Sequence, residues 1–245
     1  MEETMEGARL EVLQIDEKSW RIEDAGMVRA YLFAGEEKAL LVDSTNGTGG
    51  SLHAVVEGLT DRPIMLVNTH GDPDHTAMNH EFETAWMHPA EMAHYASWSN
   101  QPERQGQPAQ PKPAPLWEGD EIDIGGRVFE VVLLSGHTPG SIALLDRANR
   151  IVVTGDVVST VPVFLFGPAR DLTAYRASLE RLSGLRDAFD TIYPSHGAFP
   201  LGPEVIDAHI AGAARLAAGE LEPQDPPFPI PAKLYAADAC AFFYA

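Results

Sequence analysis

The stretch that most constrains this chain is residues 69–76, Thr-His-Gly-Asp-Pro-Asp-His-Thr, which directly follows the apolar run 64–67. Four of its side chains can bind a metal ion: His70, Asp72, Asp74 and His75. They are spaced too closely for a regular helix or strand to direct all four to one side. We therefore expect a loop at the end of a buried strand, holding a metal centre that stays open to substrate.

A residue able to bind a metal follows three more predicted strands, each time in a turn rich in glycine or proline. These residues are His137, Asp156 and His196. If the strand ends lie along one edge of the sheets, all seven side chains can converge. Imidazole and carboxylate groups suit zinc, and also iron or manganese. Seven ligands are too many for one tetrahedral ion, but they suit two ions that share a bridging carboxylate.

The pattern of predicted elements indicates an α/β chain. Alternating or apolar runs at 28–33, 39–42, 127–134 and 150–153 predict strands. Amphipathic patterns predict helices at about 51–59, from an N-cap at Asp171 to Gly184, and from Pro203 to Gly219. The strands form two groups, each followed by helices, which predicts two packed sheets with helices outside. No boundary divides the chain, so we expect residues 1–245 to form one domain.

Composition limits the possible partners and compartment. The formal net charge of −19 disfavours binding to nucleic acid or to an anionic membrane surface, and it leaves a small molecule as the expected substrate. The single cysteine, Cys240, excludes an internal disulfide or a Cys-rich zinc module. The acidic N-terminus has no apolar signal segment, so we expect a cytoplasmic protein. The sequence does not indicate an oligomeric state.

The set of candidate ligands resembles the metallo-β-lactamase superfamily, whose first motif is His-x-His-x-Asp-His. The resemblance covers about residues 28–200, with the later histidine, carboxylate and final histidine in the expected order. It implies a four-layer αββα sandwich of two mainly antiparallel or mixed sheets, with the metals at one edge. It also implies roles for the seven residues: His70, Asp72 and His137 at the first metal, Asp74, His75 and His196 at the second, and Asp156 as the bridge.

The main departure from the family motif is Asp72, which stands where the second histidine is usual. With Asp74 and Asp156 it makes three carboxylates facing two divalent ions, and the site keeps a net charge of about +1. We expect zinc, but the added oxygen ligand shifts the preference toward iron or manganese. The flavodiiron members of the superfamily also carry a carboxylate here. A first-metal site that has lost this ligand is the alternative.

The resemblance implies a hydrolase that uses a metal-bound hydroxide. A water between two divalent ions loses a proton near neutral pH and attacks a carbonyl group, with Asp74 orienting it or relaying its proton. We expect a small ester, thioester or lactone as substrate. Asp43, at another predicted strand end, is the candidate to support a ligand by hydrogen bonding.

The apolar segment 161–168 follows Asp156 and can be explained in two ways. It either packs in the core, or forms an apolar wall of the substrate pocket through Phe164 and Phe166. In the second case the proline-rich segment 97–117 is a candidate lid.

Two other functions stay open from the sequence. Asp72 allows a di-iron redox or oxygen-handling protein, although the flavodoxin domain that usually accompanies that chemistry is missing. The third possibility is a non-catalytic metal-binding domain of the same fold.

Overall fold

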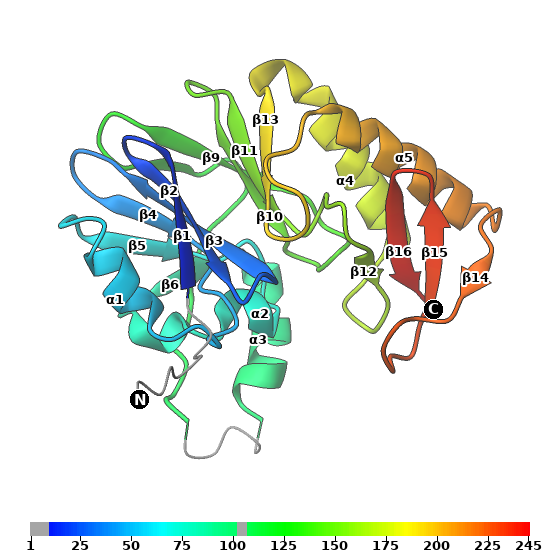
Figure 1. Cartoon of the computed structure of the whole chain (residues 1–245), viewed down its shortest axis with the longest axis horizontal. Helices are drawn as coiled ribbons and strands as arrows, with labels where there is room; N and C mark the ends of the chain where they lie inside the picture. Colours follow the sequence, from blue (N-terminus) through cyan, green and yellow to red (C-terminus); the bar gives the residue numbers. More distant parts are fainter. Residues whose placement is uncertain (1–9, 102–106) are drawn as a thin grey trace, which may run out of the picture.

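The computed structural model describes residues 10–101 and 107–245, and in these ranges the strands form three sheets (Figure 1). The first sheet has the strand order β1-β2-β3-β4-β5-β6-β7. Neighbours from β1 to β4 are antiparallel, and neighbours from β4 to β7 are parallel. The strands are β1 (Leu10–Asp16), β2 (Ser19–Asp24), β3 (Val28–Ala34), β4 (Ala39–Val42), β5 (Ile64–Val67), β6 (Ala85–Met87) and β7 (Ala114–Pro115).

The second sheet faces the first and has the order β13-β11-β10-β9-β8. Its neighbours are antiparallel except for β11 and β13, which run parallel. The strands are β8 (Glu121–Asp123), β9 (Val128–Leu133), β10 (Ile142–Asp146), β11 (Ile151–Gly155) and β13 (Thr191–Pro194).

Buried apolar clusters divide the molecule into four layers. One cluster, including Tyr31, Phe129 and Val153, lies between the two sheets. A second joins the outer face of the second sheet to α4 (Leu172–Gly184) and α5 (Glu204–Ala217). A third packs α1 (Leu52–Glu57) on the outer face of the first sheet. The order is helix, sheet, sheet, helices, as Figure 1 shows, so the predicted αββα fold is confirmed.

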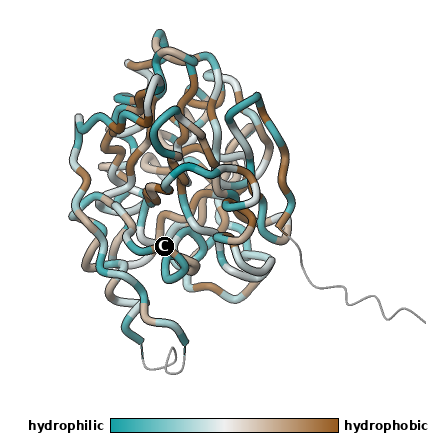
Figure 2. Tube along the Cα trace, turned by 90° about the vertical axis from the view of Figure 1, so that its left-hand side faces the viewer, coloured by the Kyte–Doolittle hydropathy of each residue, from teal (hydrophilic) through white to brown (hydrophobic). Residues whose placement is uncertain are grey.

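The predicted helices form where their start and stop signals place them. The carboxylate of Asp171 caps α4 by accepting from the Ala174 N–H at 2.8 Å, and the helix runs to Gly184. Ser51 caps α1 in the same way through Ala54. Hydrophobic stretches lie mainly in the middle of the molecule and hydrophilic ones toward its periphery (Figure 2). None of the described helices has the length and apolar character that crossing a bilayer requires.

The third, smaller sheet was not predicted. It has the order β12-β16-β15-β14 and joins a segment between β11 and β13 to the C-terminal strands. It packs beside α5 because β16 carries the fully buried Phe242, which belongs to the same cluster as Ile206 of that helix. Its strands are β12 (Val163–Leu165), β14 (Pro223–Gln224), β15 (Lys233–Ala237) and β16 (Cys240–Tyr244).

The segment 97–117, which is the candidate lid, contains regular structure near both of its ends. α3 (Met92–Ser99) extends into its beginning, and β7 near its end pairs with β6. Residues 102–106 lie outside the described part of the chain, so the lid stays an expectation there.

Candidate metal centre

The predicted ligands follow strands that end at one edge of the two main sheets. β5 leads to His70, β11 to Asp156 and β13 to His196. The connection from β9 to β10, which carries His137, lies at the same end because β10 runs antiparallel to β11. The fold therefore brings residues from four distant segments to one place.

The stretch 69–76 contains one turn of helix instead of an irregular loop. This short helix, α2 (Pro73–Thr76), has Asp72 as its N-cap residue and Pro73 at its first position, where a backbone donor is not needed. Thr76 donates its hydroxyl to the Asp72 carbonyl at 2.8 Å. Asp72 precedes the helical turn, whereas Asp74 and His75 lie within it. The side chain of Asp72 therefore points to one group of neighbours, and those of Asp74 and His75 point to another.

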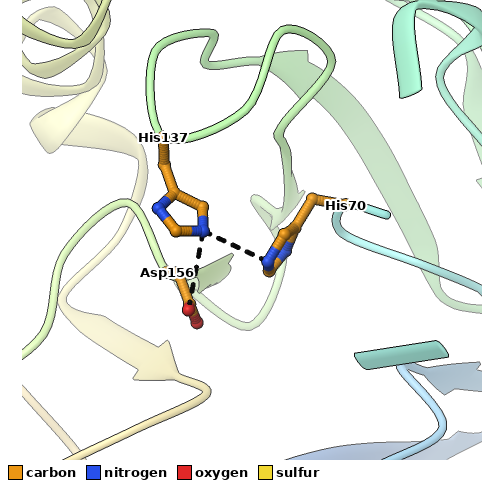
Figure 3. A group of neighbouring side chains, drawn as sticks. All are labelled: His70, His137 and Asp156. Atoms are coloured by element: carbon orange, nitrogen blue, oxygen red, sulfur yellow. Dashed lines mark hydrogen bonds and ion pairs between the residues drawn. The ribbon is translucent and has the colours of Figure 1, made fainter. Parts of the chain in front are cut away.

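The first group consists of His70, Asp72 and His137, with one oxygen of Asp156. The Nε2 atoms of His70 and His137 are 3.3 Å apart. Asp72 Oδ2 lies 3.4 Å from the first of these nitrogens and 3.3 Å from the second. Asp156 Oδ2 lies 3.7 Å from His137 Nε2. Figure 3 shows His70, His137 and Asp156 converging from three separate segments.

The second group consists of Asp74, His75 and His196, with the other oxygen of Asp156. Asp156 Oδ1 lies 3.4 Å from His75 Nε2 and 3.3 Å from His196 Nε2, and these nitrogens are 3.3 Å apart. Asp74 Oδ2 is 3.6 Å from His75 Nε2 and 3.4 Å from His196 Nε2. Each oxygen of Asp156 thus faces a different group.

These distances fit two divalent ions. Tetrahedral coordination with bonds of about 2.0 Å places neighbouring ligand atoms roughly 3.3 Å apart, which is close to the separations within both groups. The buried Asp156 Oδ1 makes no hydrogen bond within the described part of the chain, and a buried anionic oxygen of this kind suits contact with a cation. Nitrogen and carboxylate donors suit zinc, iron or manganese.

Asp43 supports the ligands without joining either group. Its Oδ2 lies 2.9 Å from His75 Nδ1 and accepts from the Thr69 hydroxyl at 2.8 Å, and its Oδ1 accepts from the Thr69 N–H at 2.7 Å. The Thr69 hydroxyl also lies 3.0 Å from His70 Nδ1. Asp43 therefore orients one histidine directly and a second through Thr69, which is the role expected for it.

The other two histidines are oriented by backbone carbonyls. His137 Nδ1 lies 2.9 Å from the Phe164 carbonyl oxygen, and His196 Nδ1 lies 2.5 Å from that of Met27. Occupying Nδ1 in this way leaves Nε2 as the atom that is available to coordinate an ion. All four imidazoles thus present Nε2 to the centre.

The sequence profile of the Metallo-beta-lactamase superfamily matches residues 24–196, which include every predicted ligand. This chain belongs to the metallo-beta-lactamase superfamily. The predicted resemblance is therefore confirmed.

Curated relatives of this superfamily member have hydrolase names. Acyl-coenzyme A thioesterase MBLAC2 of Gallus gallus is 29% identical over 204 residues, covering 71% of this chain and 74% of the relative. The Homo sapiens protein of the same name is 26% identical over 212 residues, with the same coverage. Probable metallo-hydrolase YqgX of Bacillus subtilis is 28% identical, covering 57% of this chain and 71% of the relative. The chain is accordingly a hydrolase of the metallo-beta-lactamase superfamily.

Solved structures agree on the fold. The metallo-beta-lactamase from Pontibacter korlensis superposes with a TM-score of 0.68 at 19% identity, covering 84% of this chain and 99% of that one. The family protein from Thermus thermophilus gives a TM-score of 0.64 at 23% identity, covering 78% and 76%.

Two glycines allow the ligand loops of this superfamily member to approach their neighbours. Gly155, just before Asp156, has φ +55°, and a Cβ there would lie 2.7 Å from the Thr69 hydroxyl oxygen. Gly136, just before His137, has φ +132°, and a Cβ would lie 2.2 Å from the Tyr175 nitrogen. Both positions combine an unfavourable φ with a clash, so only glycine fits.

Without bound metal, the acidic and basic ligands stabilise one another's charges. Burial opposes ionisation of Asp156, but the imidazoles of His196 and His75 hold the pKa of its carboxyl well below the usual value. Burial likewise opposes protonation of His196, but Asp156 and Asp74 raise its pKa to about 10. The pKa of His75 is also well above its usual value, since Asp156, Asp74 and Asp43 outweigh burial.

These shifts predict how the metal-free protein responds to pH. A histidine whose pKa is raised on folding stabilises the native state below its unfolded pKa of about 6.5, and this stability is lost as the pH rises through the folded pKa. The melting temperature of the chelator-treated protein should therefore fall by several degrees between pH 6.5 and 10. Thermal denaturation of metal-free protein across this range measures the effect.

The matched variant for this experiment is His196→Asn, which removes one titrating ligand. Its melting temperature should depend less on pH over the same range. A melting temperature that stays constant or rises from pH 6.5 to 10 in the unsubstituted protein would contradict the charge network described above.

A cavity of about 290 Å³ opens on the metal centre. Its lining includes the polar groups of Asp74, Asp156 and His196 and the apolar segment 161–164. Phe164 thus reaches the cavity, whereas Phe166 packs against the Phe164 ring at a tilt, with ring centroids 5.6 Å apart, and does not line the cavity. None of the described residues of segment 97–117 lines it either.

Three residues beside the ligands were not identified from the sequence. Fully buried Glu91 accepts from the Gly71 N–H at 2.7 Å and the Gly140 N–H at 2.5 Å, which joins the first ligand loop to the His137 loop. His94 and Arg170 both contact the Asp72 carboxylate. No spacing pattern in the sequence connects these three residues to the motif at residues 69–76.

Proposed function

We propose that this hydrolase binds two divalent ions, most simply zinc, and cleaves small thioesters. The observation that carries the proposal is the arrangement of Asp156, whose two oxygens face two complete groups of ligands at the base of a partly apolar cavity. Relatives named acyl-coenzyme A thioesterase support the thioester over the ester or lactone that the sequence also allowed.

The proposed residue roles follow from where each side chain lies. His70, Asp72 and His137 would hold one ion, Asp74, His75 and His196 would hold the other, and Asp156 would contribute an oxygen to each. Two ions bound here would supply a water of lowered pKa and a Lewis acid for the substrate carbonyl. The chain itself supplies the positions of these ligands, fixed by Asp43 and by the carbonyls of Phe164 and Met27.

Asp74 is the ligand best placed to exchange a proton with a reacting group. Its side chain is 42% exposed and lines the cavity, whereas the side chains of Asp72 and Asp156 are each 14% exposed. We assign to Asp74 the orientation of the attacking water and the relay of its proton.

The apolar wall defines the acyl group that the cavity accepts. A volume of about 290 Å³ lies at the lower end of the usual range for ligand pockets, roughly 300–1,000 Å³. Such a cavity holds a short acyl chain against the segment 161–164, and the larger thiol part of the substrate stays outside it. We therefore propose short-chain acyl thioesters as the preferred class.

Hydrolysis of a substrate panel tests this proposal. Zinc-loaded protein is assayed with acetyl-, butyryl- and octanoyl-coenzyme A, matched p-nitrophenyl esters, a lactone and a phosphodiester, with His75→Ala as the control. We expect the highest kcat/KM with a short thioester, and loss of that activity in the control. Higher kcat/KM with another class overturns the substrate assignment, and no activity above the control favours the non-catalytic alternative.

Metal analysis of protein purified without added metal addresses the redox alternative, which rests on the carboxylate at position 72. Two colourless zinc ions per chain agree with the proposed hydrolase. Two irons with a visible absorption band, together with no thioester hydrolysis, would instead favour a di-iron redox protein.

Replacing Phe164 by Ala should raise KM for a butyryl thioester about tenfold, because the ring forms part of the apolar wall. The substitution keeps the backbone carbonyl that orients His137, so kcat should change little. Steady-state kinetics and chemical unfolding measure KM and stability separately.

Phe166→Ala is the matched control, since this ring packs on Phe164 outside the cavity. It should leave KM within about threefold of the unsubstituted enzyme. If both variants lose stability and neither changes KM, segment 161–168 serves core packing only.

A further inference from the structure

The carboxylate of Asp72 contacts two cationic or hydrogen-bonding groups besides the metal ligands. Arg170 donates from Nη2 to Asp72 Oδ2 at 2.5 Å, and His94 Nε2 lies 2.5 Å from Asp72 Oδ1. Oδ2 is also the oxygen that lies 3.3–3.4 Å from the Nε2 atoms of His70 and His137. A carboxylate oxygen has two lone pairs, so one can accept from Arg170 while the other is directed at an ion.

Arg170 is held in place as part of the cavity wall. It lies directly before Asp171, the N-cap residue of α4, so the start of that helix fixes its backbone. Its side chain is only 12% exposed, and its Nε has no partner among the described residues. A guanidinium stays protonated at every physiological pH, so a fixed positive charge lies beside the first group of ligands.

The positive charge of Arg170 changes the net charge of the proposed metal centre. Three carboxylates facing two divalent ions leave about +1, as the sequence predicts. Including Arg170 raises the balance to about +2, which is the value that the superfamily motif gives with a neutral histidine in place of Asp72. The aspartate and the arginine together thus have the net charge of the histidine that they replace.

We propose that Arg170 is the charge partner of Asp72, and that the Asp72–Arg170 pair is the electrostatic substitute for the second histidine of the superfamily motif. His94 fixes the outer oxygen of the carboxylate, which keeps Oδ2 directed at His70 and His137. This inference rests on the metal binding proposed above and is independent of the choice of thioester substrate. It predicts that residues 72 and 170 are coupled in metal affinity.

A double-mutant cycle on zinc affinity tests the coupling without any substrate. The full-length variants Asp72→His, Arg170→Gln and Asp72→His/Arg170→Gln are made metal-free and titrated with Zn²⁺ against a chromophoric chelator. Asp72→His restores the motif histidine but leaves the arginine charge unpaired, and we expect one zinc site to weaken about 10- to 100-fold. The double variant should return to within about threefold of the unsubstituted protein, and Arg170→Gln alone should bind zinc more tightly.

The controls separate charge pairing from simpler roles. Arg147→Gln removes an exposed arginine that pairs with Glu130 and lies in the turn between β10 and β11, at the opposite end of these strands from His137 and Asp156, and it should leave zinc affinity unchanged. Thermal denaturation of each metal-free variant establishes that it is folded. Equal affinities of Asp72→His and the double variant overturn the proposal, because Arg170 then has no effect on the ion.

Asp72→Ala provides a second route to refutation. If this variant binds two zinc ions with unchanged affinity, Asp72 is no ligand, and the arginine merely holds an idle carboxylate. A loss of affinity at one site, with the second site unchanged, supports the pair as part of the metal centre.

Discussion

Replacing Asp156 by Asn is expected to lower kcat/KM for thioester hydrolysis by at least about 10³-fold, equivalent to roughly 4 kcal/mol of transition-state stabilisation. The reason is that the two oxygens of Asp156 face different groups of ligands. The amide removes the negative charge and points an NH2 group at one of the two groups. Steady-state kinetics with zinc-loaded protein measures the loss of activity, and elemental analysis measures the metal retained.

The same substitution also distinguishes a bridging role from simple support. A bridge contributes to both ions, so Asp156→Asn should weaken both zinc sites, whereas His75→Ala should weaken mainly one. Asp61→Asn is the control, since its carboxylate is 94% exposed and lies in no ligand group. Two zinc ions bound at full affinity, with kcat/KM reduced less than tenfold, would remove Asp156 from the proposed centre.

The sequence contains enough information to predict the fold and the candidate ligands because both leave local patterns, whereas the division of these ligands into two groups is implied by the resemblance to the superfamily. A metal-binding residue flanked by glycine or proline after an apolar run identifies a strand end, and the order of four such ends matches the superfamily motif. Asp43 could be included on the same basis, since it ends β4. The strand order then places these strand ends at one edge of the sheets.

The surroundings of the ligands could not be predicted in this way. Glu91, His94 and Arg170 reach the site from elements that no motif connects, and Arg170 lies 98 residues from its partner Asp72. The net charge of the site could not be counted from the seven candidate ligands alone, because the positive charge of the largely buried Arg170 offsets the negative charge of one carboxylate. The third sheet was missed for a similar reason, since the pairing of β12 with β16 joins segments far apart in the chain.

Glu91 shows how such a residue can control the metal site without touching it. Its two carboxylate oxygens accept from the N–H groups of Gly71 and Gly140, one on each side of the first group of ligands. A charged acceptor of this kind holds two loops at a fixed separation with hydrogen bonds that are stronger than those between neutral groups. The position of His70 relative to His137 therefore depends on Glu91.

Replacing Glu91 by Gln is expected to lower the free energy of unfolding by about 2–3 kcal/mol, because one N–H group loses its acceptor and meets an amide donor in a buried site. The melting temperature should fall by roughly 4–12 °C for a chain of this size. Zinc affinity at the first group should fall about 10- to 100-fold, the usual cost of disturbing a residue that orients a ligand. Thermal denaturation and chelator competition measure the two effects.

Zinc affinity and melting temperature, measured on the same variants, distinguish a positioning role of Glu91 from general destabilisation. If Glu91 positions the ligand loops, Glu91→Gln should weaken zinc binding even at a temperature where the metal-free variant is fully folded, and it should spare the second group, whose ligands Glu91 does not contact. Glu57→Gln, at a carboxylate that is 64% exposed, should change neither quantity. A Glu91→Gln variant that melts earlier but binds zinc with the affinity of the unsubstituted protein would limit Glu91 to a structural role.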